Sequence, residues 1–560
     1  MARNKRGGDE LVFVPLGGVG EIGKNMGLYG FGPENDRKWL VVDCGVTFGG
    51  PDLPGIELIM PDPRFLEEEA DGVVGLVLTH AHEDHYGAVL DLWPGFDAPV
   101  YATPFAAAML KAKRLSNAIE EDVEVKIFQS GKPFDVGPFH VEAIDMSHSI
   151  PESCALLIDT PAGRVLHTGD WKLDPGPVGT PHTDIERLKA IGAEGKPLAL
   201  ICDSTNAMKD GESPSEAEVA VNLDRLISEA PYRVAVTIFA SNLGRMISVA
   251  RAAKKAGREV VAAGRAVHRV AGIARELGLM EGIPDFLDQD AYGYLPREKT
   301  VLICTGSQGE SRAAMARIAA GNHPVIDLSP GDRVIFSSWS IPGNEKAVID
   351  IQNQLVDRGV ELITGREEMV HVSGHPRRHE LVKLYDWVKP SLLVPVHGEP
   401  MHLEAHAKLG RENGIKTAYS ARNGDMVRLF PEPAHYPSEV PTGILYLDGN
   451  ILCTPEESRV RDRRKLAFGG LVVVSLAVNG KGQIVSGPVF DLDGIPELEE
   501  DDDPLSDVIH SAAHGAIKSF PEKRRTDTAR FAEAVRRAVR SETNAVWGRR
   551  PIVKVFVHKV

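Results

Sequence analysis

A dense cluster of metal-ligand side chains places the strongest constraint on how this chain can fold. Three histidines and an aspartate lie within the six-residue segment 80–85, His-Ala-His-Glu-Asp-His. The apolar run 75–78 precedes this segment, and Tyr86-Gly87-Ala88 is predicted to begin a helix. The cluster therefore lies where a strand ends and the backbone turns, which is where open α/β sheets bind ligands. Histidine and carboxylate are common ligands of zinc-like ions, so the segment predicts a metal centre rather than a solvated loop.

The spacing within the segment favours two metal ions rather than one. His80 and His82, two residues apart, can point toward one ion, whereas Asp84 and His85 lie past the bend and can point toward a neighbouring ion. Polar residues of the same kinds stand at or just past the ends of other apolar strands, at Asp43, His148, Asp170, Asp203 and His397. Packing does not explain metal-binding types at one end of successive strands.

Asp43 ends the predicted strand 39–45. Its carboxylate could simply cap the strand end. The neighbouring metal-binding pattern favours another role, in which Asp43 accepts a hydrogen bond from the outward-facing nitrogen of a ligand histidine.

The length of 560 residues predicts several domains. From Pro214 onward, strands and helices alternate as in a parallel α/β domain, and metal-binding residue types then return at His371–His375 and His397. The predicted domains are a first domain in two parts (1–213 and 366–450), an inserted domain (214–365), a linker (451–464) in an irregular, proline-rich stretch, and a C-terminal domain (465–560) for oligomerisation or interaction. The glycine-rich turn 17–23 lacks the spacing of a dinucleotide-binding fingerprint and precedes a predicted strand, so we exclude a nucleotide cofactor there.

Composition and the pattern of apolar residues indicate where the protein acts and which kinds of partner it can bind. The net charge of −16 argues against a protein that coats nucleic acid by bulk electrostatics, although it allows a local basic groove. No apolar run approaches the ~18 residues of a membrane span, and no apolar segment follows the basic N-terminus, so we expect a cytoplasmic protein without a membrane anchor. The five scattered cysteines are predicted to be reduced core residues. The acidic run 497–503 is predicted to be a solvated loop.

Two sets of residues, taken in chain order, resemble the motifs of a known family. The set that matches the H-x-H-x-D-H signature of the metallo-β-lactamase superfamily, with its supporting positions, is Asp43, the segment 80–85, His148 and Asp170. The set that matches the three further motifs of the β-CASP nuclease branch is Asp203, His375 and His397. With the insertion and the C-terminal extension, the whole chain resembles the ribonuclease J family of bacteria. Alanine at position 81, where glycine is also common, leaves the ligands untouched.

The resemblance implies both a fold and a metal centre. The fold is α/β, a metallo-β-lactamase αββα sandwich with an inserted parallel α/β β-CASP domain and a small α+β C-terminal domain. One ion would be held by His80, His82 and His148. The other would be held by Asp84, His85 and His397, with Asp170 bridging the two. We expect two divalent ions per subunit, with ligand types that favour zinc and also admit manganese, and a bridging water activated to hydroxide that attacks phosphorus.

The leaving 3′-oxygen needs a proton or electrostatic stabilisation. His375 is the candidate for this catalytic role, and Asp203 would orient and charge it. The alternatives are a structural turn contact for His375 and a helix cap for Asp203. In the family, the loop equivalent to His371–His375 binds substrate together with a Ser-Asn segment of the inserted domain. The residues expected to bind phosphate here are His371, Val372, Ser373, Gly374, His375, Ser241, Asn242 and Arg245.

The expected substrate is single-stranded RNA with a 5′-monophosphate. A phosphate pocket at a fixed distance from the metals suits 5′-to-3′ exonuclease action, while passage of RNA through the cleft suits endonuclease action, and the family is known for both in RNA maturation and mRNA decay. His397 favours RNA over DNA, since the DNA-repair branch typically carries valine at this position. The family also implies a homodimer or homotetramer and partners in an RNA degradosome. The rival interpretations are a superfamily hydrolase acting on a thioester, a lactam or DNA, and an inactive RNA-binding subunit. The intact ligand set disfavours the inactive subunit.

Overall fold

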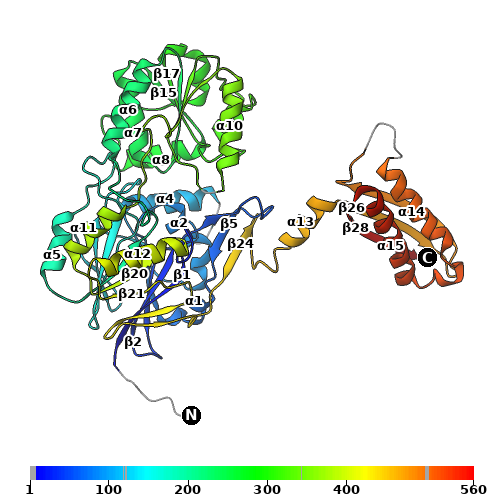
Figure 1. Ribbon diagram of the computed structural model, residues 1–560, viewed down its shortest axis with the longest axis horizontal. Helices are drawn as coiled ribbons and strands as arrows, with labels where there is room; N and C mark the ends of the chain where they lie inside the picture. The colour runs from blue at the N-terminus through cyan, green and yellow to red at the C-terminus, as the bar shows by residue number, and fades with distance from the viewer. Residues whose placement is uncertain (1–7, 118, 120–122, 342, 498–503) are drawn as a thin grey trace. The chain divides into compact units, whose positions relative to one another are not determined.

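The computed structural model describes residues 8–560 except 118, 120–122, 342 and 498–503. The acidic run 497–503 lies almost wholly outside the described residues. The chain forms two compact units, the first made of residues 1–48 and 58–445 and the second of residues 49–57 and 446–560. Figure 1 shows the secondary structure of both. Among the described residues, no helix has the length and apolar character that a membrane crossing requires.

Two β-sheets lie face to face in the first unit. The eight-stranded sheet has the order β23 (Ala434–Tyr436), β22 (Met426–Phe430), β1 (Glu10–Gly17), β2 (Met26–Gly32), β3 (Lys38–Val42), β6 (Val73–Val77), β7 (Val100–Ala102) and β8 (Val125–Ile127). The seven-stranded sheet has the order β21 (Thr417–Ala418), β20 (Leu392–Val396), β13 (Leu198–Asp203), β12 (Arg164–His167), β11 (Cys154–Asp159), β10 (Phe139–Asp145) and β9 (Phe134–Val136). Their inner faces share one apolar core, which includes Leu11, Leu40, Val141, Leu156 and Val394.

Helices cover the outer faces of this pair of sheets. The short helices α1 (Arg64–Glu68), α2 (Glu83–Tyr86) and α3 (Val89–Leu92) occur between β5 (Leu58–Pro61) and β7 along the chain, and α4 (Pro104–Ser116) packs on β7 and β8. On the other side, α5 (Ile185–Ala193), α11 (Arg378–Val388) and α12 (Pro400–Glu412) pack against the seven-stranded sheet, through residues such as Leu188, Leu384 and Leu409. The predicted αββα sandwich is therefore confirmed.

The inserted segment forms a six-stranded parallel sheet of its own. Its strand order is β16 (Leu287–Asp288), β15 (Glu259–Ala263), β17 (Thr300–Cys304), β14 (Val234–Thr237), β18 (Arg333–Phe336) and β19 (Glu361–Ile363). Its helices are α6 (Glu216–Glu229), α7 (Leu243–Lys255), α8 (Arg265–Glu276), α9 (Ala314–Ala319) and α10 (Glu345–Asp357). Figure 1 shows α6 and α7 on one side of the strands and α10 on the other. Buried strands with helices on both faces are what the alternating pattern of the sequence predicted.

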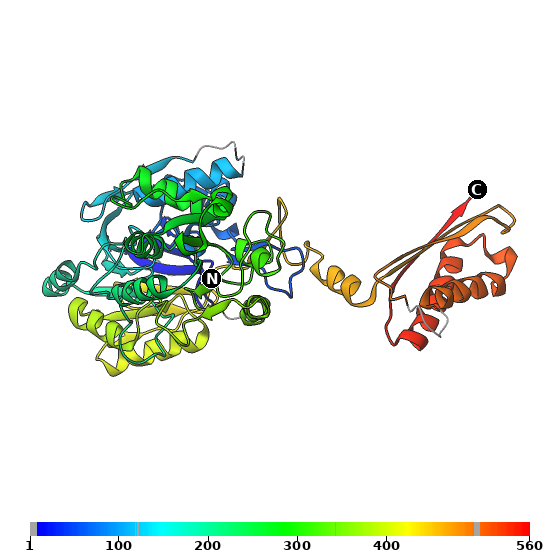
Figure 2. The same cartoon turned by 90° about the horizontal axis from the view of Figure 1, so that it is seen from above.

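The second unit contains a three-stranded sheet, ordered β27 (Ile484–Asp493), β26 (Leu471–Val478) and β28 (Ile552–Lys559). Along β26, buried and half-buried residues alternate, because one face packs on α14 (Leu505–Ser519) and α15 (Thr528–Trp547). Figure 2 shows these two helices, in orange and red, together on one side of the strands. The helix α13 (Val460–Gly469) precedes the sheet.

The stretch between residues 430 and 460 is more regular than its proline content suggested. The short strands β23, β24 (Ile444–Asp448) and β25 (Ile451–Cys453) lie there, and β24 pairs with β25 in an antiparallel arrangement. The two-residue strand β4 (Thr47–Phe48) pairs with β5 (Leu58–Pro61) in the same way. Strands of two to five residues carry little sequence signal, which explains why they were missed.

One buried carboxylate joins three segments of the first unit that are far apart in sequence. Glu380, in the first turn of α11, is fully buried. Its Oε1 accepts a hydrogen bond from the backbone N–H of Leu173 at 2.7 Å, and its Oε2 accepts from the N–H groups of Ser213 at 2.8 Å and Arg377 at 2.9 Å. Glu380 thereby fixes the segments that lead into and out of the inserted domain.

We predict that Glu380→Gln destabilises the first unit by about 2 kcal/mol, because an amide group would turn a donor toward backbone donors that need an acceptor. Chemical denaturation measures the change. The exposed Glu412→Gln is the matched control and should leave stability unchanged. Equal stability of the two variants would contradict this role of Glu380.

Candidate metal centre

The candidate ligands gather because several strands end at the same edge of the two sheets. The strands β12, β13 and β20 are parallel neighbours, so their carboxyl ends lie side by side. Asp170 follows β12, Asp203 ends β13 and His397 follows β20. His148 follows β10, and the segment 80–85 follows β6 on the facing sheet. The sequence predicted that the helix after β6 begins near Tyr86. In the structure this helix begins at Glu83, so His85 lies within a helical turn.

The first group of ligand-type side chains contains three histidines and one aspartate: His80, His82, His148 and Asp170. One ligand atom from each lies within 4.8 Å of all the others. His82 Nδ1 lies 3.2 Å from His80 Nε2 and 3.0 Å from His148 Nε2. Burial is the main reason that the pKa of each histidine is lowered, to about 4 for His82, so all three imidazoles are neutral near pH 7.

The hydrogen bonds on the outer side of these rings determine which nitrogens carry hydrogen. His148 Nδ1 donates to the carbonyl of Gly374 at 2.8 Å, so its Nε2 presents a lone pair to the centre. The hydroxyl of Thr79 donates to Asp43 at 2.8 Å, so this oxygen accepts from His80 Nδ1 at 3.0 Å, and His80 Nε2 is also a lone pair. His82 Nδ1 can donate to either His80 Nε2 or His148 Nε2 but not to both. At least one of these nitrogen lone pairs therefore has no proton donor. A cation satisfies this arrangement.

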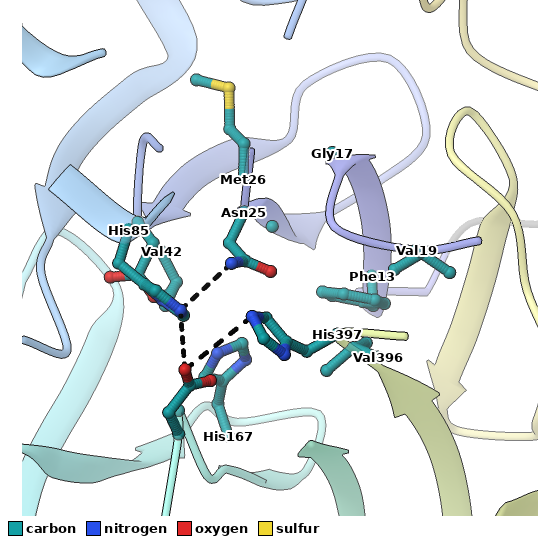
Figure 3. A pocket seen from close by; sticks show the side chains of 14 residues that line it. Phe13, Gly17, Val19, Asn25, Met26, Val42, His85, His167, Val396 and His397 are labelled. Carbon is teal, nitrogen blue, oxygen red and sulfur yellow. Dashed lines mark hydrogen bonds and ion pairs between the residues drawn. The ribbon is translucent and has the colours of Figure 1, made fainter. Parts of the chain in front are cut away.

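The second group consists of Asp84, His85, Asp170 and His397, whose ligand atoms again lie within 4.8 Å of one another. His397 Nε2 lies 3.1 Å from Asp84 Oδ2, and His85 Nε2 lies 3.2 Å from Asp170 Oδ2. Their outer nitrogens are also held, His85 Nδ1 by Asp43 at 2.7 Å and His397 Nδ1 by Thr205 Oγ1 at 2.7 Å. Figure 3 shows His85 and His397 directed into one pocket.

Charge distinguishes the second group from the first. Burial works to lower the pKa of His85 and His397, but the surrounding carboxylates, Asp170 above all, raise both pKa values. Burial likewise works to raise the pKa of Asp84 and Asp170, but the neighbouring histidines lower both. These carboxylates are therefore anionic. In the absence of metal they hold protons on the imidazoles, at the positions where a cation would bind.

Asp170 belongs to both groups, as a bridging ligand must. Its Oδ2 lies 3.9 Å from His80 Nε2 and 3.8 Å from both His148 Nε2 and His397 Nε2. Its Oδ1 is buried and has no hydrogen-bond partner among the described residues. An ionised oxygen without a partner is costly inside a protein, and a divalent cation would supply the missing partner. The donor set and its geometry therefore fit metal ions.

His375 is paired with Asp203, and together with Asp170 and His397 they form a third group whose ligand-type atoms lie within 4.8 Å of one another. His375 Nδ1 lies 2.8 Å from Asp203 Oδ2, and the other carboxylate oxygen of Asp203 accepts from the backbone N–H and the hydroxyl of Thr205, each at 2.8 Å. Burial works to lower the pKa of His375, but Asp203 and then Asp170 raise it. The side chain of His375 remains partly exposed, whereas that of Asp203 is fully buried. His375 can therefore meet a bound molecule, and Asp203 acts through it.

The loop His371–His375 lies beside the ligands, and its central residues have defined contacts. Ser373 Oγ accepts from Asn206 Nδ2 at 2.9 Å and from the backbone N–H of His375 at 3.3 Å. A Cβ atom at Gly374 would lie 2.6 Å from the ring of His148, so only glycine fits there without displacing a candidate ligand. Val372 is buried and can offer only its backbone to a substrate. His371 Nδ1 is buried and has no partner among the described residues.

The structure gives Arg245 a different role from the one that the sequence suggested. We expected it to bind phosphate, but its side chain is 0% exposed and forms an ion pair with Glu216 at 2.9 Å. It also donates to the carbonyl of Val370 at 2.6 Å. A bound phosphate cannot reach this guanidinium, so Arg245 instead fixes the start of the 371–375 loop against the inserted domain.

The neighbouring residues of the Ser-Asn segment differ in how far they are available. Asn242 is buried and caps α7, with its Oδ1 accepting from the backbone N–H of Arg245 at 2.9 Å. Its oxygen is therefore occupied. Ser241 is half-buried and precedes the helix, so it is the member of the pair that can contact a substrate.

Sequence reasoning missed the polar residues that hold the ligands. Thr79 and Thr205 orient His80 and His397 as described above. Asn25 Nδ2 lies 3.0 Å from both the carbonyl of Asp84 and His85 Nε2. The glycine-rich turn 17–23 before Asn25 was a usable signal, because it lets the backbone N–H of His397 donate to the carbonyl of Gly18 at 2.7 Å. The turn therefore helps to position His397, a candidate ligand.

Comparison with known proteins identifies similar sequences over nearly the whole chain. Four families match: "Beta-lactamase superfamily domain" (38–189), "Ribonuclease J, beta-CASP domain" (231–355), "Zn-dependent metallo-hydrolase RNA specificity domain" (359–420) and "Ribonuclease J C-terminal domain" (458–560). Ribonuclease J of Sinorhizobium meliloti is 51% identical over 552 residues, which cover 99% of this chain and 98% of the relative. Ribonuclease J of Mycolicibacterium smegmatis is 38% identical over 551 residues, covering 97% and 96%. A crystal structure of a protein of unknown function from Enterococcus faecalis shares the fold, with a TM-score of 0.52, 17% identity and coverage of 75% of this chain and 100% of that chain.

We predict that Asp43→Asn weakens metal binding about 10- to 100-fold. Asp43 Oδ1 accepts from the backbone N–H of Thr79, and Oδ2 accepts from the Thr79 hydroxyl and from His85 Nδ1, so an amide would turn its NH₂ group toward one of these sets of donors. Asparagine tolerates the left-handed backbone at this position, where φ is 63°. Competition with a chelator and elemental analysis of the purified protein measure the change.

The exposed Asp386→Asn is the control for this experiment and should retain metal as the wild type does. If Asp43→Asn also kept full metal content and affinity, the carboxylate of Asp43 would have no part in orienting His85.

Proposed function

The chain belongs to the ribonuclease J family, a family of metal-dependent nucleases, and we propose that it degrades single-stranded RNA from a 5′-monophosphate end and also cuts RNA internally. One observation carries this proposal. Three groups of ligand-type side chains share Asp170, and the third includes the His375–Asp203 pair. The loop His371–His375 lies beside them. Such an arrangement suits hydrolysis of a phosphodiester bond, and its place in the family directs it to RNA.

The residues that would hold two divalent ions follow from the two groups of side chains. We assign His80, His82 and His148 to one ion and Asp84, His85 and His397 to the other, with Asp170 shared. Bound divalent ions lower the pKa of water and offset the charge that develops on phosphorus-bound oxygens. The many imidazoles favour zinc, and the shared carboxylate also accommodates manganese.

His375 is the candidate proton donor to the leaving 3′-oxygen. Burial works to lower the pKa of His375, but Asp203 and Asp170 raise it, which favours the protonated imidazole, and the partly exposed ring can face a substrate. Asp203 accepts at Nδ1, which directs Nε2 of the same ring outward and stabilises the imidazolium. Thr205 in turn holds the Asp203 carboxylate and the His397 ring, so one hydroxyl couples the proton donor to the metal ligands.

The 371–375 loop provides the proposed grip on a 5′-phosphate. Ser373 and the backbone of Gly374 would contact the phosphate, with Ser241 approaching from the inserted domain. A phosphate held at a fixed distance from the metal ligands defines which bond is cut, so each step would release one nucleotide. RNA that passes through without a free end would be cut internally. We place this activity in RNA maturation and mRNA decay.

The remaining assignments concern assembly and location. We propose a first domain in two parts (1–213 and 366–450), an inserted domain (214–365), a linker (451–464) and a C-terminal domain (465–560). The C-terminal domain would join subunits into a dimer or tetramer and contact partners of an RNA degradosome. The open face of its sheet exposes apolar side chains, including Val489 and Phe556, in support of such contacts. Cytoplasmic action is consistent with an RNA substrate and with five buried cysteines that form no disulfide.

The phosphate grip predicts a preference between RNA ends. Purified protein with Zn²⁺ or Mn²⁺ should release mononucleotides faster from 5′-monophosphorylated RNA than from the same RNA with a 5′-triphosphate. Thin-layer and gel analysis of end-labelled and internally labelled RNA measures this. Equal internal cutting of both substrates would contradict exonuclease action as the main activity.

The proposed proton donor predicts a loss in kcat. His375→Ala should lower kcat about 10²- to 10⁴-fold while metal content stays at the wild-type level, because this ring is not among the assigned metal ligands. Asp203→Asn should follow the same pattern to a smaller extent. Steady-state kinetics with elemental analysis measure both.

The exposed His379→Ala removes the same residue type four positions along the chain and should leave kcat unchanged. A normal kcat in His375→Ala would exclude the role of proton donor. A loss of metal from the variant would show instead that His375 is a ligand.

A further inference from the structure

Trp339 is an exposed aromatic residue whose position no assigned role explains. It follows β18 at the carboxyl end of the inserted parallel sheet, and 49% of its surface is exposed. Ligands of parallel α/β sheets bind at this end of the strands. An exposed indole there is a candidate contact surface for a bound molecule.

A buried side chain holds the backbone of this segment in place. Gln308, at 6% exposure, donates from Nε2 to the carbonyl of Trp339 at 2.9 Å and accepts at Oε1 from the backbone N–H of Ile341 at 2.7 Å. One amide group thus fixes the residues on both sides of Ser340. The exposure of the indole is therefore a property of an anchored segment rather than of a loose loop.

Neighbouring residues cover part of the indole and leave part of it open. A Cβ atom built on Gly365 would lie 3.2 Å from the six-membered ring of Trp339, so the ring rests close to that glycine. The imidazole of His371 meets the indole edge-on, with centroids 6.4 Å apart and an interplanar angle of 76°. The neighbours therefore fix the orientation of the ring while nearly half of the residue stays accessible.

The same contacts connect Trp339 to the candidate substrate loop. His371, which touches the indole, begins the loop that ends at His375, and four residues span at most about 14 Å. Arg245 strengthens the connection, because its guanidinium donates to the carbonyls of Ser337 at 3.2 Å and Val370 at 2.6 Å. The segment that carries Trp339 and the loop that would grip phosphate are thus held against each other.

We propose that Trp339 stacks on a nucleobase of the bound RNA, a short distance from the phosphate held by the 371–375 loop. This proposal rests on the proposed RNA substrate and adds a base-binding position to it. Every base has a flat π-face, so an anchored indole that is partly open binds bases with little sequence preference. A nucleic-acid strand is the favoured occupant, rather than a protein, because the indole adjoins the candidate substrate loop.

The test uses the full-length protein and hydrolysis-resistant single-stranded RNAs that each lack one base at a different position. Trp339→Ala should weaken binding of the intact RNA about 10-fold or more, and Trp339→Phe should retain most of the affinity. For the wild type, an RNA that lacks the stacked base should bind about 10-fold more weakly than the intact RNA. For Trp339→Ala, removal of that same base should cost nothing further, since the stacking is already lost.

Tyr294→Ala is the matched control, since Tyr294 is an aromatic residue of the same domain with 90% exposure. Its binding should equal that of wild type. If Trp339→Ala binds every RNA of the series as the wild type does while still hydrolysing RNA, the base-stacking proposal is overturned and the proposed function stands. If Trp339→Ala hydrolyses RNA as the wild type does but loses a contact with another subunit or protein, Trp339 lies on a protein-docking surface. That result would also overturn the base-stacking proposal. If the wild type neither binds nor cleaves RNA, the proposed function itself fails.

Discussion

The carboxylate of Asp170 is the interaction on which the rest of the site depends. It is buried among His80, His85, His148 and His397, whose ring nitrogens approach its Oδ2 to between 3.2 and 3.9 Å. Such a carboxylate stays ionised only when positive charge surrounds it, and its Oδ1 has no partner among the described residues. Both groups of ligand-type side chains therefore share this one carboxylate, and a cation would supply the partner that its Oδ1 lacks.

Hydrogen bonds behind the candidate ligands fix the orientation of the histidine rings in both groups. Asp43 holds His85 directly and His80 through Thr79, so one carboxylate orients a ligand in each group. Thr205 similarly holds His397 and Asp203, which couples the second group to His375. In the first group, groups outside the centre fix the tautomers of His80 and His148, so their lone pairs are arranged before any ion binds. In the second group the same kind of contact fixes the orientation of the rings, and a binding ion would displace their protons.

How much of this the sequence could predict depends on the range of the interaction. The candidate ligands could be selected because each stands at or just past the end of a strand, which is a local pattern. The alternation of strands and helices predicted the inserted parallel domain, whereas the αββα sandwich was implied by the family resemblance. The roles of Thr205 and Asn25 could not be predicted from the sequence, because their partners are distant along the chain. Thr205 and His397, for example, are 192 residues apart. Arg245 was misassigned for a related reason, since only the fold shows that Glu216 and Val370 surround its guanidinium.

The topology also explains why the inserted domain lies at the site. The strands β13 and β20 are adjacent and parallel, with Asp203 paired in register with Val396, yet the whole insertion separates them in sequence. After Asp203 the chain leaves the sheet at the edge where the candidate metal ligands gather. It must return to the opposite edge of the sheet to begin β20, because β20 is parallel to β13. It does so through the 371–375 loop and α11, so the loop crosses the site on its way back. The insertion between these two strands thus has its exit segment beside the candidate metal ligands, where Arg245 and Glu380 fix that segment at either end.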